Sequence, residues 1–251
     1  MKRLSLCCLL ALAGLTDSVS IANAAQAIAA AKVDAGWTSL FDGKSLDGWH
    51  VIARPDDVDK DFWKVEDGLL VCDSRGRKKH NYVWLMSNAE YGDFEFKLKV
   101  RSYKDSTGNA GIQVRSRYDH KEQWLDGPQI DLHPPGPYRT GLIYDETRGV
   151  KHWIHPVLPG TAMKPEEGVQ GWKWKHADDG DGWNEIHVIC RGTQITTTVN
   201  GVPAANYDGK GVLDDAAHRA LNVGLNGHIA LQLHTGSDLY IQYKDIVLKK
   251  L

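Results

Sequence analysis

Alternation of apolar and polar residues is the feature that most restricts how this chain folds. It recurs in short stretches at 94–100, 112–117, 186–191, 229–234 and 239–243. A period of two places successive side chains on opposite faces of a β-strand. The stretches are separated by Gly, Asp and Asn turns, and helical periodicity is confined to one short segment. This pattern predicts an all-β fold, a jelly-roll β-sandwich of two antiparallel sheets.

The N-terminal residues 1–24 have the layout of a secretory signal peptide. Two basic residues precede an apolar run over 4–15, which is too short to span a bilayer, and an Ala-x-Ala site follows at 22–24. We therefore expect a periplasmic or secreted protein with no membrane span in the rest of the chain. We assign no role to the Ala-rich segment 25–35 and expect residues 36–251 to form a single domain.

The charge balance excludes one class of partner. The chain carries 30 basic and 32 acidic side chains and a formal net charge of −2. Because nucleic-acid binding calls for a basic surface, we expect no nucleic-acid partner.

Two cysteines lie beyond the signal peptide, Cys72 and Cys190. In an oxidising compartment they could form a disulfide bond, and the alternative is two separate buried thiols. The sequence leaves both open, because it does not fix the distance between them.

Polar side chains share one phase of the alternation on three expected strands. A solvated sheet face usually carries Lys, Glu, Ser and Thr, whereas these strands carry Gln, Arg, Asp and His. More ionisable side chains follow the second strand, after a Pro/Gly turn. These residues are candidates for a polar site: Gln113, Arg115, Gln129, Asp131, His133, Gln232 and His234 on the strands, and Tyr144, Asp145, Glu146 and Arg148 after the turn.

Several blocks of the chain, in order, resemble the 3-keto-disaccharide hydrolase family. In one of these blocks, at 108–112, Ala110 stands where the family usually has Ser. The blocks lie at 36–49 (GWTSLFDGKSLDGW), 63–68, 91–94, 108–112, 127–131, 142–149 and 227–236 (GHIALQLHTG). The resemblance covers nearly the whole chain after the signal peptide. It implies a concanavalin A-like lectin or glucanase sandwich, in agreement with the alternation.

The residues disfavour hydrolysis by two carboxylates. Retaining glycosidases need a nucleophilic and an acid/base carboxyl about 5–5.5 Å apart. Gln129 stands where comparable glucanase strands carry a carboxylate, and Asp131 has no second carboxylate beside it on that face.

The family activity that the resemblance implies is a different reaction, in which a ketone at C3 acidifies the C2 proton of a glycoside. A base removes that proton, the group at C1 leaves by elimination, and water adds back. This chemistry needs a base with a near-neutral pKa and a group that stabilises the enolate oxygen. The substrate would be a 3-keto-disaccharide or another 3-keto-sugar, supplied by a sugar 3-dehydrogenase.

We assign candidate roles on this basis. The candidate catalytic residues are His133, His234, Asp131, Glu146 and Asp145. The candidate substrate-binding residues are Gln113, Arg115, Gln129, Tyr144, Arg148, Gln232 and Trp153. Which of the catalytic residues is the base stays open.

The sequence leaves a divalent metal ion open as a cofactor. Carboxylates and imidazoles are suitable ligands, but the chain has no His-x-His or His-Glu-x-x-His spacing. Two other functions remain: a non-catalytic, lectin-like carbohydrate-binding module, and an envelope structural or adhesion domain. A lectin needs no group with a tuned pKa, and a structural domain needs no convergence of the polar strands.

Overall fold

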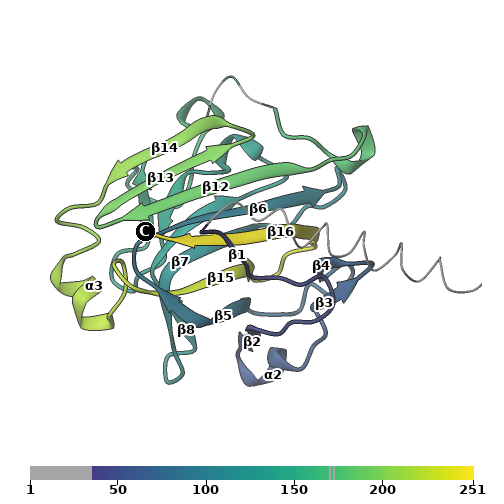
Figure 1. The fold of residues 1–251 in the computed structure, drawn as a ribbon, viewed down its shortest axis with the longest axis horizontal. Coiled ribbons are helices and arrows are strands. Elements are labelled where there is room, and N and C mark those ends of the chain that lie inside the picture. The colour runs from purple at the N-terminus through teal and green to yellow at the C-terminus, as the bar shows by residue number, and fades with distance from the viewer. Residues whose placement is uncertain (1–35, 170, 172) are drawn as a thin grey trace, which may run out of the picture. The chain divides into compact units, whose positions relative to one another are not determined.

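Two antiparallel sheets of eight strands each pack face to face in the computed structural model, which describes residues 36–169, 171 and 173–251 (Figure 1). The first sheet, sheet A, has the strand order β14-β13-β12-β6-β16-β4-β3, and β1 pairs with β16. The second, sheet B, has the order β11-β10-β9-β7-β15-β5-β2, and β8 pairs with β7. The predicted two-sheet antiparallel sandwich is confirmed.

The strands of sheet A are β1 (Thr38–Ser39), β3 (Trp63–Glu66), β4 (Leu69–Asp73), β6 (Phe94–Ser102), β12 (Asn184–Arg191), β13 (Gln194–Val199), β14 (Val202–Asp208) and β16 (Tyr240–Lys250). Those of sheet B are β2 (Trp49–Ala53), β5 (Val83–Tyr91), β7 (Ala110–Asp119), β8 (Trp124–Asp126), β9 (Pro128–Leu132), β10 (Ile143–Asp145), β11 (His152–His155) and β15 (Gly227–Leu233). The helices are short: α2 (Pro55–Val58), α3 (Ala216–Leu221) and the 3-10 turns Pro137–Arg139, Pro165–Glu167 and Ala177–Asp179.

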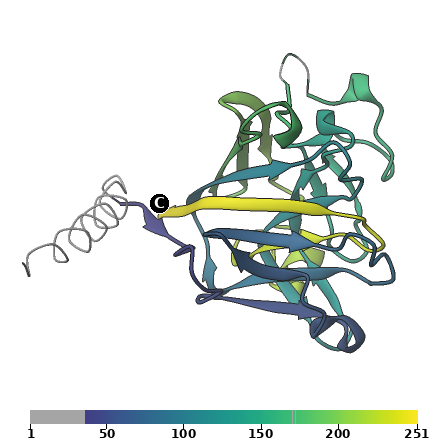
Figure 2. The same ribbon diagram turned by 90° about the vertical axis from the view of Figure 1, so that its right-hand side faces the viewer.

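Sheet A follows the alternation of its sequence. In β6 the apolar residues Phe94, Phe96, Leu98 and Val100 are fully buried, and the polar residues between them are half-buried. These four side chains pack into the main core with apolar side chains of sheet B. The yellow strand β16 runs beside β6 in the middle of sheet A in both views (Figures 1 and 2).

Sheet B is buried on both faces where β7, β9 and β15 lie side by side. Ile112, Ile130 and Leu231 face the core, so the residues that alternate with them face away from it. Gln113 and Gln232 on that outer face are nonetheless 0 % exposed. At these strands the outer face of sheet B is therefore not a solvent-exposed sheet face.

Cys72 and Cys190 are free, buried thiols. They lie on β4 and β12, and β6 and β16 run between those strands. At about 4.8 Å per strand, the two backbones are roughly 14 Å apart, well beyond the range of roughly 4.4–6.8 Å between the Cα atoms of a disulfide. The disulfide alternative is wrong, and the alternative of two separate thiols is confirmed.

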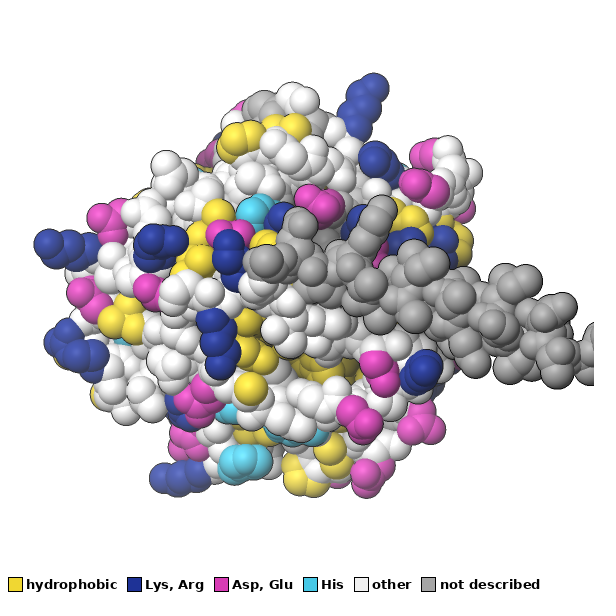
Figure 3. Space-filling model, in the orientation of Figure 1, with side chains coloured by type: hydrophobic (Ala, Val, Ile, Leu, Met, Phe, Trp, Pro, Cys, Tyr) yellow, Lys and Arg dark blue, Asp and Glu magenta, His cyan; other side chains and the backbone are white. Residues whose placement is uncertain are grey.

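Trp37–Leu251 clusters as one compact unit. The predicted signal peptide and the Ala-rich segment at 25–35 lie outside the described residues. Among the residues that are described, no helix has both the length and the apolar character to cross a membrane. Basic and acidic side chains are interspersed over the molecular face in Figure 3.

Candidate functional site

Four adjacent strands of sheet B bring polar residues into one row on its outer face. Trp84 of β5 pairs directly with Gln232 of β15, and Gln232 pairs with Gly111 of β7. Gly111 in turn pairs with Asp131 of β9. Directly paired residues point to the same face of a sheet, so residues far apart in the sequence meet here.

A second row lies beside the first. Gln113 of β7 pairs with Gln129 of β9, which pairs with Tyr144 of β10. Gly111 makes room for the Gln129 side chain, because a Cβ atom at residue 111 would lie 2.5 Å from the Gln129 Cδ atom. We call Gln113, Gln129 and Gln232 the amide floor.

The amide floor and the neighbouring Trp84 carry buried hydrogen-bonding atoms without partners among the described residues. Among the described residues, nothing pairs with Oε1 of Gln113 or Gln129, with either amide atom of Gln232, or with Nε1 of Trp84. These four side chains belong to residues that are at most 2 % exposed. Buried polar groups are normally paired, so this set of donors and acceptors points to a ligand or ordered water.

Asp131 forms an ion pair at one end of the floor. Arg139, from the 3-10 turn after β9, donates from Nε and Nη2 to the two carboxylate oxygens at 3.1 and 3.2 Å. Burial raises the pKa of Asp131 to about 6, and the Arg139 charge opposes that rise. The guanidinium also lies 5.1 Å from the centroid of the Trp153 ring, which it covers.

Glu146 follows β10 and is only 6 % exposed. Burial is the main reason that its pKa rises to about 7; Lys151 lowers it, and the charges of Asp131 and Asp145 raise it further. The Gln232 amide approaches closely enough to lower the Glu146 pKa a little, but no hydrogen bond of ordinary geometry joins them.

The main chain of Glu146 is fixed by Trp124, whose indole Nε1 donates to the Glu146 carbonyl oxygen at 2.8 Å. The Lys151 Nζ atom lies 3.5 Å from the centroid of the same indole ring. Trp124 therefore holds both the backbone of the carboxyl residue and a cation that lowers its pKa.

Two half-buried histidines border the floor, and both are neutral at pH 7. Burial lowers the pKa of His234, and burial with the Arg139 charge lowers that of His133 to about 4. The His234 Nδ1 atom is 3.1 Å from the Thr235 carbonyl oxygen, which only accepts, so Nδ1 carries the proton. Nε2 of His234 then accepts from the Tyr82 hydroxyl at 2.9 Å.

The structure thus gathers most of the predicted site residues. We call the group the polar cluster: the amide floor with Asp131, His133, Tyr144, Glu146 and His234. An envelope structural or adhesion domain would not need these side chains to converge.

Arg115 lies outside the polar cluster. Its φ of +50° interrupts the alternation of β7, and its fully buried guanidinium donates to the carbonyl oxygens of Gly92 and Gly224 and to the Asp93 carboxylate. Arg115, which was predicted to contact substrate, therefore does not face the polar cluster. Its guanidinium instead connects loops through these hydrogen bonds.

Asp145 and Arg148 also lie apart from it. Asp145 is on the opposite phase of β10 from Tyr144 and accepts from His218 Nε2 at 2.9 Å. The Asp145 charge still reaches Glu146, whose pKa it raises. Arg148 is held by Asp126 and Asp119 in two ion pairs.

Trp153 of β11 pairs with Tyr144, so it lies beside the cluster on the same face of sheet B, and it is 0 % exposed. Its indole Nε1 donates to the Thr161 carbonyl oxygen at 3.0 Å, and its ring packs edge-on against Tyr144. It packs against Tyr144 and Arg139, and because it is fully buried it is not an open platform for a sugar ring.

Sequence reasoning missed Tyr82, Trp84, Arg139 and Lys151. Trp84 had a readable signal, because it lies in an apolar stretch that forms β5 beside β15. The other three lie in loops or turns, where no periodicity indicates which face a side chain joins.

The residues present do not assemble a metal site. No three His, Cys, Asp or Glu side chains of the described part of the chain group closely enough to hold an ion. Asp131 is engaged by Arg139 and Asp145 by His218. We derive no step through a metal ion.

The comparisons with known proteins identify a glycan-related class. The chain belongs to the family of 3-keto-alpha-glucoside-1,2-lyase-like domains, whose model matches residues 36–249. The predicted family is thereby confirmed. No curated protein sequence matches the chain.

Solved structures share the fold. A protein of Parabacteroides distasonis ATCC 8503, described as a candidate glycosyl hydrolase, is 17 % identical with a TM-score of 0.57, over 86 % of this chain and 94 % of that one. A Bacillus subtilis protein of unknown function with a galectin-like fold is 11 % identical with a TM-score of 0.54, over 85 % and 94 %. The non-specific endo-beta-1,3(4)-glucanase SCLam of family GH16 is 10 % identical with a TM-score of 0.50, over 87 % and 93 %. The predicted concanavalin A-like jelly roll is confirmed.

Proposed function

We propose that this protein cleaves the glycosidic bond of 3-keto-α-glucosides by C2 deprotonation, elimination and hydration. The observation that carries the proposal is Glu146, a buried carboxyl with a pKa of about 7 beside the amide floor. A general base is most effective when its pKa lies near the working pH. Membership of the lyase-like family supports the substrate class.

The reaction balances without a redox step. The base takes the C2 proton, and the electrons of that bond form an enolate with the C3 oxygen. The enolate expels the oxygen on C1, and the departing alcohol takes a proton. Water then adds to C1 of the enone while C2 regains a proton, so one water is consumed. The C3 ketone must come from an oxidation of the C3 hydroxyl, the reaction of a sugar 3-dehydrogenase.

In this proposal Glu146 is the base. It passes the C2 proton to the departing oxygen, and it later takes a proton from the incoming water and delivers it to C2. Nε2 of Gln232 and Nε1 of Trp84 are unpartnered hydrogen-bond donors suited to the enolate oxygen, since fixed donors in a dry site stabilise developing charge. Gln113 and Gln129 offer acceptors to sugar hydroxyls.

The remaining groups orient substrate and water. The ion pair of Asp131 with Arg139 marks one end of the sugar site. Tyr82, fixed by His234, and the unpartnered Nδ1 of His133 are available to the departing oxygen and to the incoming water.

We further propose that this chemistry takes place in the periplasm or outside the cell. The support is the signal-peptide layout of residues 1–24. The test is fractionation of expressing cells and sequencing of the mature N-terminus, which should lie near Ala25; protein retained uncleaved in the cytoplasm would contradict this.

The reaction is tested by incubating the protein with a 3-keto-disaccharide in D2O, beside the unoxidised parent sugar. Elimination and hydration place deuterium at C2 of the released keto sugar, and the parent stays intact. Glu146→Gln should lower the rate at least about 100-fold, the smallest usual effect of a general base. The exposed Glu185 on β12 gives a matched control, and Glu185→Gln should keep the rate.

Enzyme-free samples correct for spontaneous exchange at C2. Release of sugar without deuterium at C2 would replace elimination by direct hydrolysis. Binding of the keto sugar with no turnover would favour the lectin-like alternative. Loss of turnover in EDTA, restored by a divalent ion, would contradict a metal-free mechanism.

A further inference from the structure

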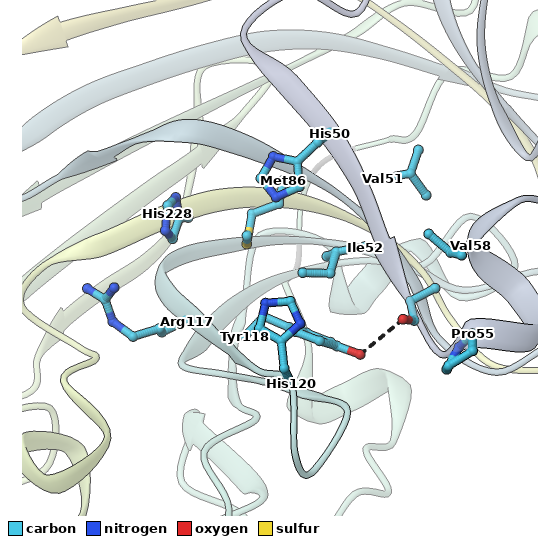
Figure 4. Close-up of a pocket in the computed structure, with 11 residues that line it drawn as sticks. His50, Val51, Ile52, Pro55, Val58, Met86, Arg117, Tyr118, His120 and His228 are labelled. Carbon is cyan, nitrogen blue, oxygen red and sulfur yellow. Dashed lines mark hydrogen bonds between the residues drawn. The ribbon is translucent and has the colours of Figure 1, made fainter.

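A depression lies on the outer face of sheet B, beside the polar cluster. It has a volume of about 610 Å³ and is lined by residues of β2, β5, β7, β15 and α2. We call it the side pocket and define it by Ile52, Val58, Met86, Arg117 and Tyr118, which line it. Figure 4 shows these side chains around the pocket. Ligand sites usually have volumes of about 300–1,000 Å³.

The side pocket lies next to the polar cluster on the outer face of sheet B, where Met86, which lines the pocket, and Gln113 both pair with Ala230. Met86 follows Trp84 by two residues on β5, so they share a face and are about 7 Å apart along the strand. Both belong to one apolar cluster with Tyr118, and the half-buried Trp124, which holds Glu146, packs against it. The Trp84 and Tyr118 ring centroids are 5.8 Å apart. From a sugar over the amide floor, a substituent would need to extend about 7 Å along β5 to lie in the side pocket.

The lining suits an apolar ligand. In Figure 4, Val51, Val58 and Pro55 lie along one edge of the pocket, and Ile52 and Met86 lie nearer its middle. A second sugar here would face aliphatic side chains with several hydroxyls, and buried hydroxyls without partners are costly. A flat apolar ring has no such cost.

The lining also suits a neutral ligand. Arg117 and His228 lie together at the other edge of the pocket in Figure 4. Arg117 donates to both carboxylate oxygens of Glu90, at 2.7 and 2.8 Å, and to the Asn222 carbonyl oxygen. The His228 Nε2 atom is 3.4 Å from the same carboxylate. Because Glu90 already balances this edge, the pocket offers no unbalanced cation to an acidic ligand.

We propose that the side pocket receives the group that leaves from C1, and that this group is a phenol. This inference rests on the proposed function for the place of the sugar. Its ring would lie against Met86 and Tyr118, while the pyranose occupies the amide floor. In the reaction the C1–O bond breaks, its electrons go to the phenolic oxygen, and that oxygen takes the proton removed from C2.

Leaving-group chemistry supports a phenol. A phenol such as that of tyrosine has a pKa near 10, far below that of an alkyl alcohol, so its oxygen departs with little help from an acid. Both histidines beside the amide floor have lowered pKa values. A site without a protonated imidazole at neutral pH serves a phenol better than a sugar alcohol.

The test compares binding first, because a phenol leaves faster whatever the pocket does. Phenyl and methyl α-D-glucosides, which lack the ketone and do not eliminate, compete against cleavage of a 3-keto-disaccharide. Phenyl glucoside should bind about tenfold more tightly, the effect of removing roughly 55 Å² of apolar surface from water.

Val58→Asp places a carboxylate on the apolar edge. Val58 is 37 % exposed, so the fold should tolerate the change. The variant should lose most of the phenyl preference and bind methyl glucoside as before. Val157 is 78 % exposed and does not line the side pocket, and Val157→Asp should keep the preference.

Equal binding of phenyl and methyl glucosides would overturn the inference, and so would a preference that survives Val58→Asp. Cleavage of 3-keto-disaccharides without any phenyl preference would refute the role proposed for the side pocket and leave the proposed reaction standing. A phenyl preference, measured by direct titration, in a protein that cleaves no keto sugar would refute the proposed reaction and leave the apolar pocket standing. Binding of neither glucoside to a protein that also cleaves nothing would overturn both.

Discussion

Replacing Glu146 by Gln should stabilise the fold at alkaline pH while it removes activity. The Glu146 carboxyl is buried, and its pKa rises from 4.5 to about 7, chiefly because burial disfavours the charged form. The folded chain therefore holds a proton there that the unfolded chain has already lost. Since the folded state binds more protons, the free energy of unfolding falls as the pH rises from about 4.5 to 7.

The size of the effect follows from the two pKa values. Each pH unit between them is worth about 1.36 kcal/mol, so the charged carboxyl lowers the free energy of unfolding by about 3 kcal/mol above pH 8. The amide of the Glu146→Gln variant would not ionise and would escape that loss. At pH 4 the carboxyl is protonated in both states, and the variant should gain nothing from this source.

The assay is urea unfolding of the parent protein and of Glu146→Gln at pH 4 and pH 8.5. The stability difference between the two proteins should be about 3 kcal/mol more favourable to the variant at pH 8.5 than at pH 4. Taking the difference between the two pH values cancels any constant cost of the amide. The stability difference between the parent protein and Glu185→Gln, a change at an exposed position, should be the same at the two pH values.

A stability difference that does not change with pH would refute the reasoning. It would mean that Glu146 titrates as an exposed carboxyl does, and Glu146 would then lose its claim to be the base. A pH dependence of the opposite sign would mean that its charged form is stabilised by partners in the folded chain.

Three further changes have defined outcomes. Gly111→Ala should push the Gln129 side chain out of place. We expect the free energy of unfolding to fall by about 1–3 kcal/mol and kcat/KM for the keto sugar to fall as well. Unfolding and rate measurements check both, and unchanged values would contradict the packing. Two carboxylates outweigh the effect of burial and raise the pKa of His218 above 6.5, so its stabilising charge is present below pH 6.5 and lost as the pH rises through the folded value. His218→Gln should therefore cost about 3 kcal/mol at pH 5.5 and less at pH 9, and an equal loss at both pH values would refute this charge. Because Cys72 and Cys190 are free and buried, both should react with a thiol reagent only after unfolding, and reductant should leave the melting temperature unchanged; a lower melting temperature in reductant would indicate a disulfide.

Alternation in the sequence was sufficient to predict the sandwich and part of the site. Along β7, β9 and β15 it separated Ile112, Ile130 and Leu231, which face the core, from the residues that face away. Gln113 and Gln232 were assigned correctly to the second set because a strand fixes its two faces by geometry alone. The family blocks identified the glycan-related class in the same way, from local residue order.

Local rules failed where the backbone leaves regular geometry. Arg115 was placed in the site by its phase in β7, but a positive φ removes it from the alternation. Asp145 and Glu146 are adjacent in sequence, yet one pairs with His218 and the other borders the amide floor. The end of β10 between them decides this, and the sequence does not mark where a short strand ends.

The sequence by itself determined which residues form strands, which strand faces are polar and which family the chain resembles, because these depend on neighbours a few positions apart. Only the tertiary structure decided that Arg139 reaches Asp131 and that burial raises the Glu146 pKa to about 7. A pKa depends on every charge and every buried surface around a group. Those surroundings come from strands and loops that are distant in sequence and meet only in the folded chain.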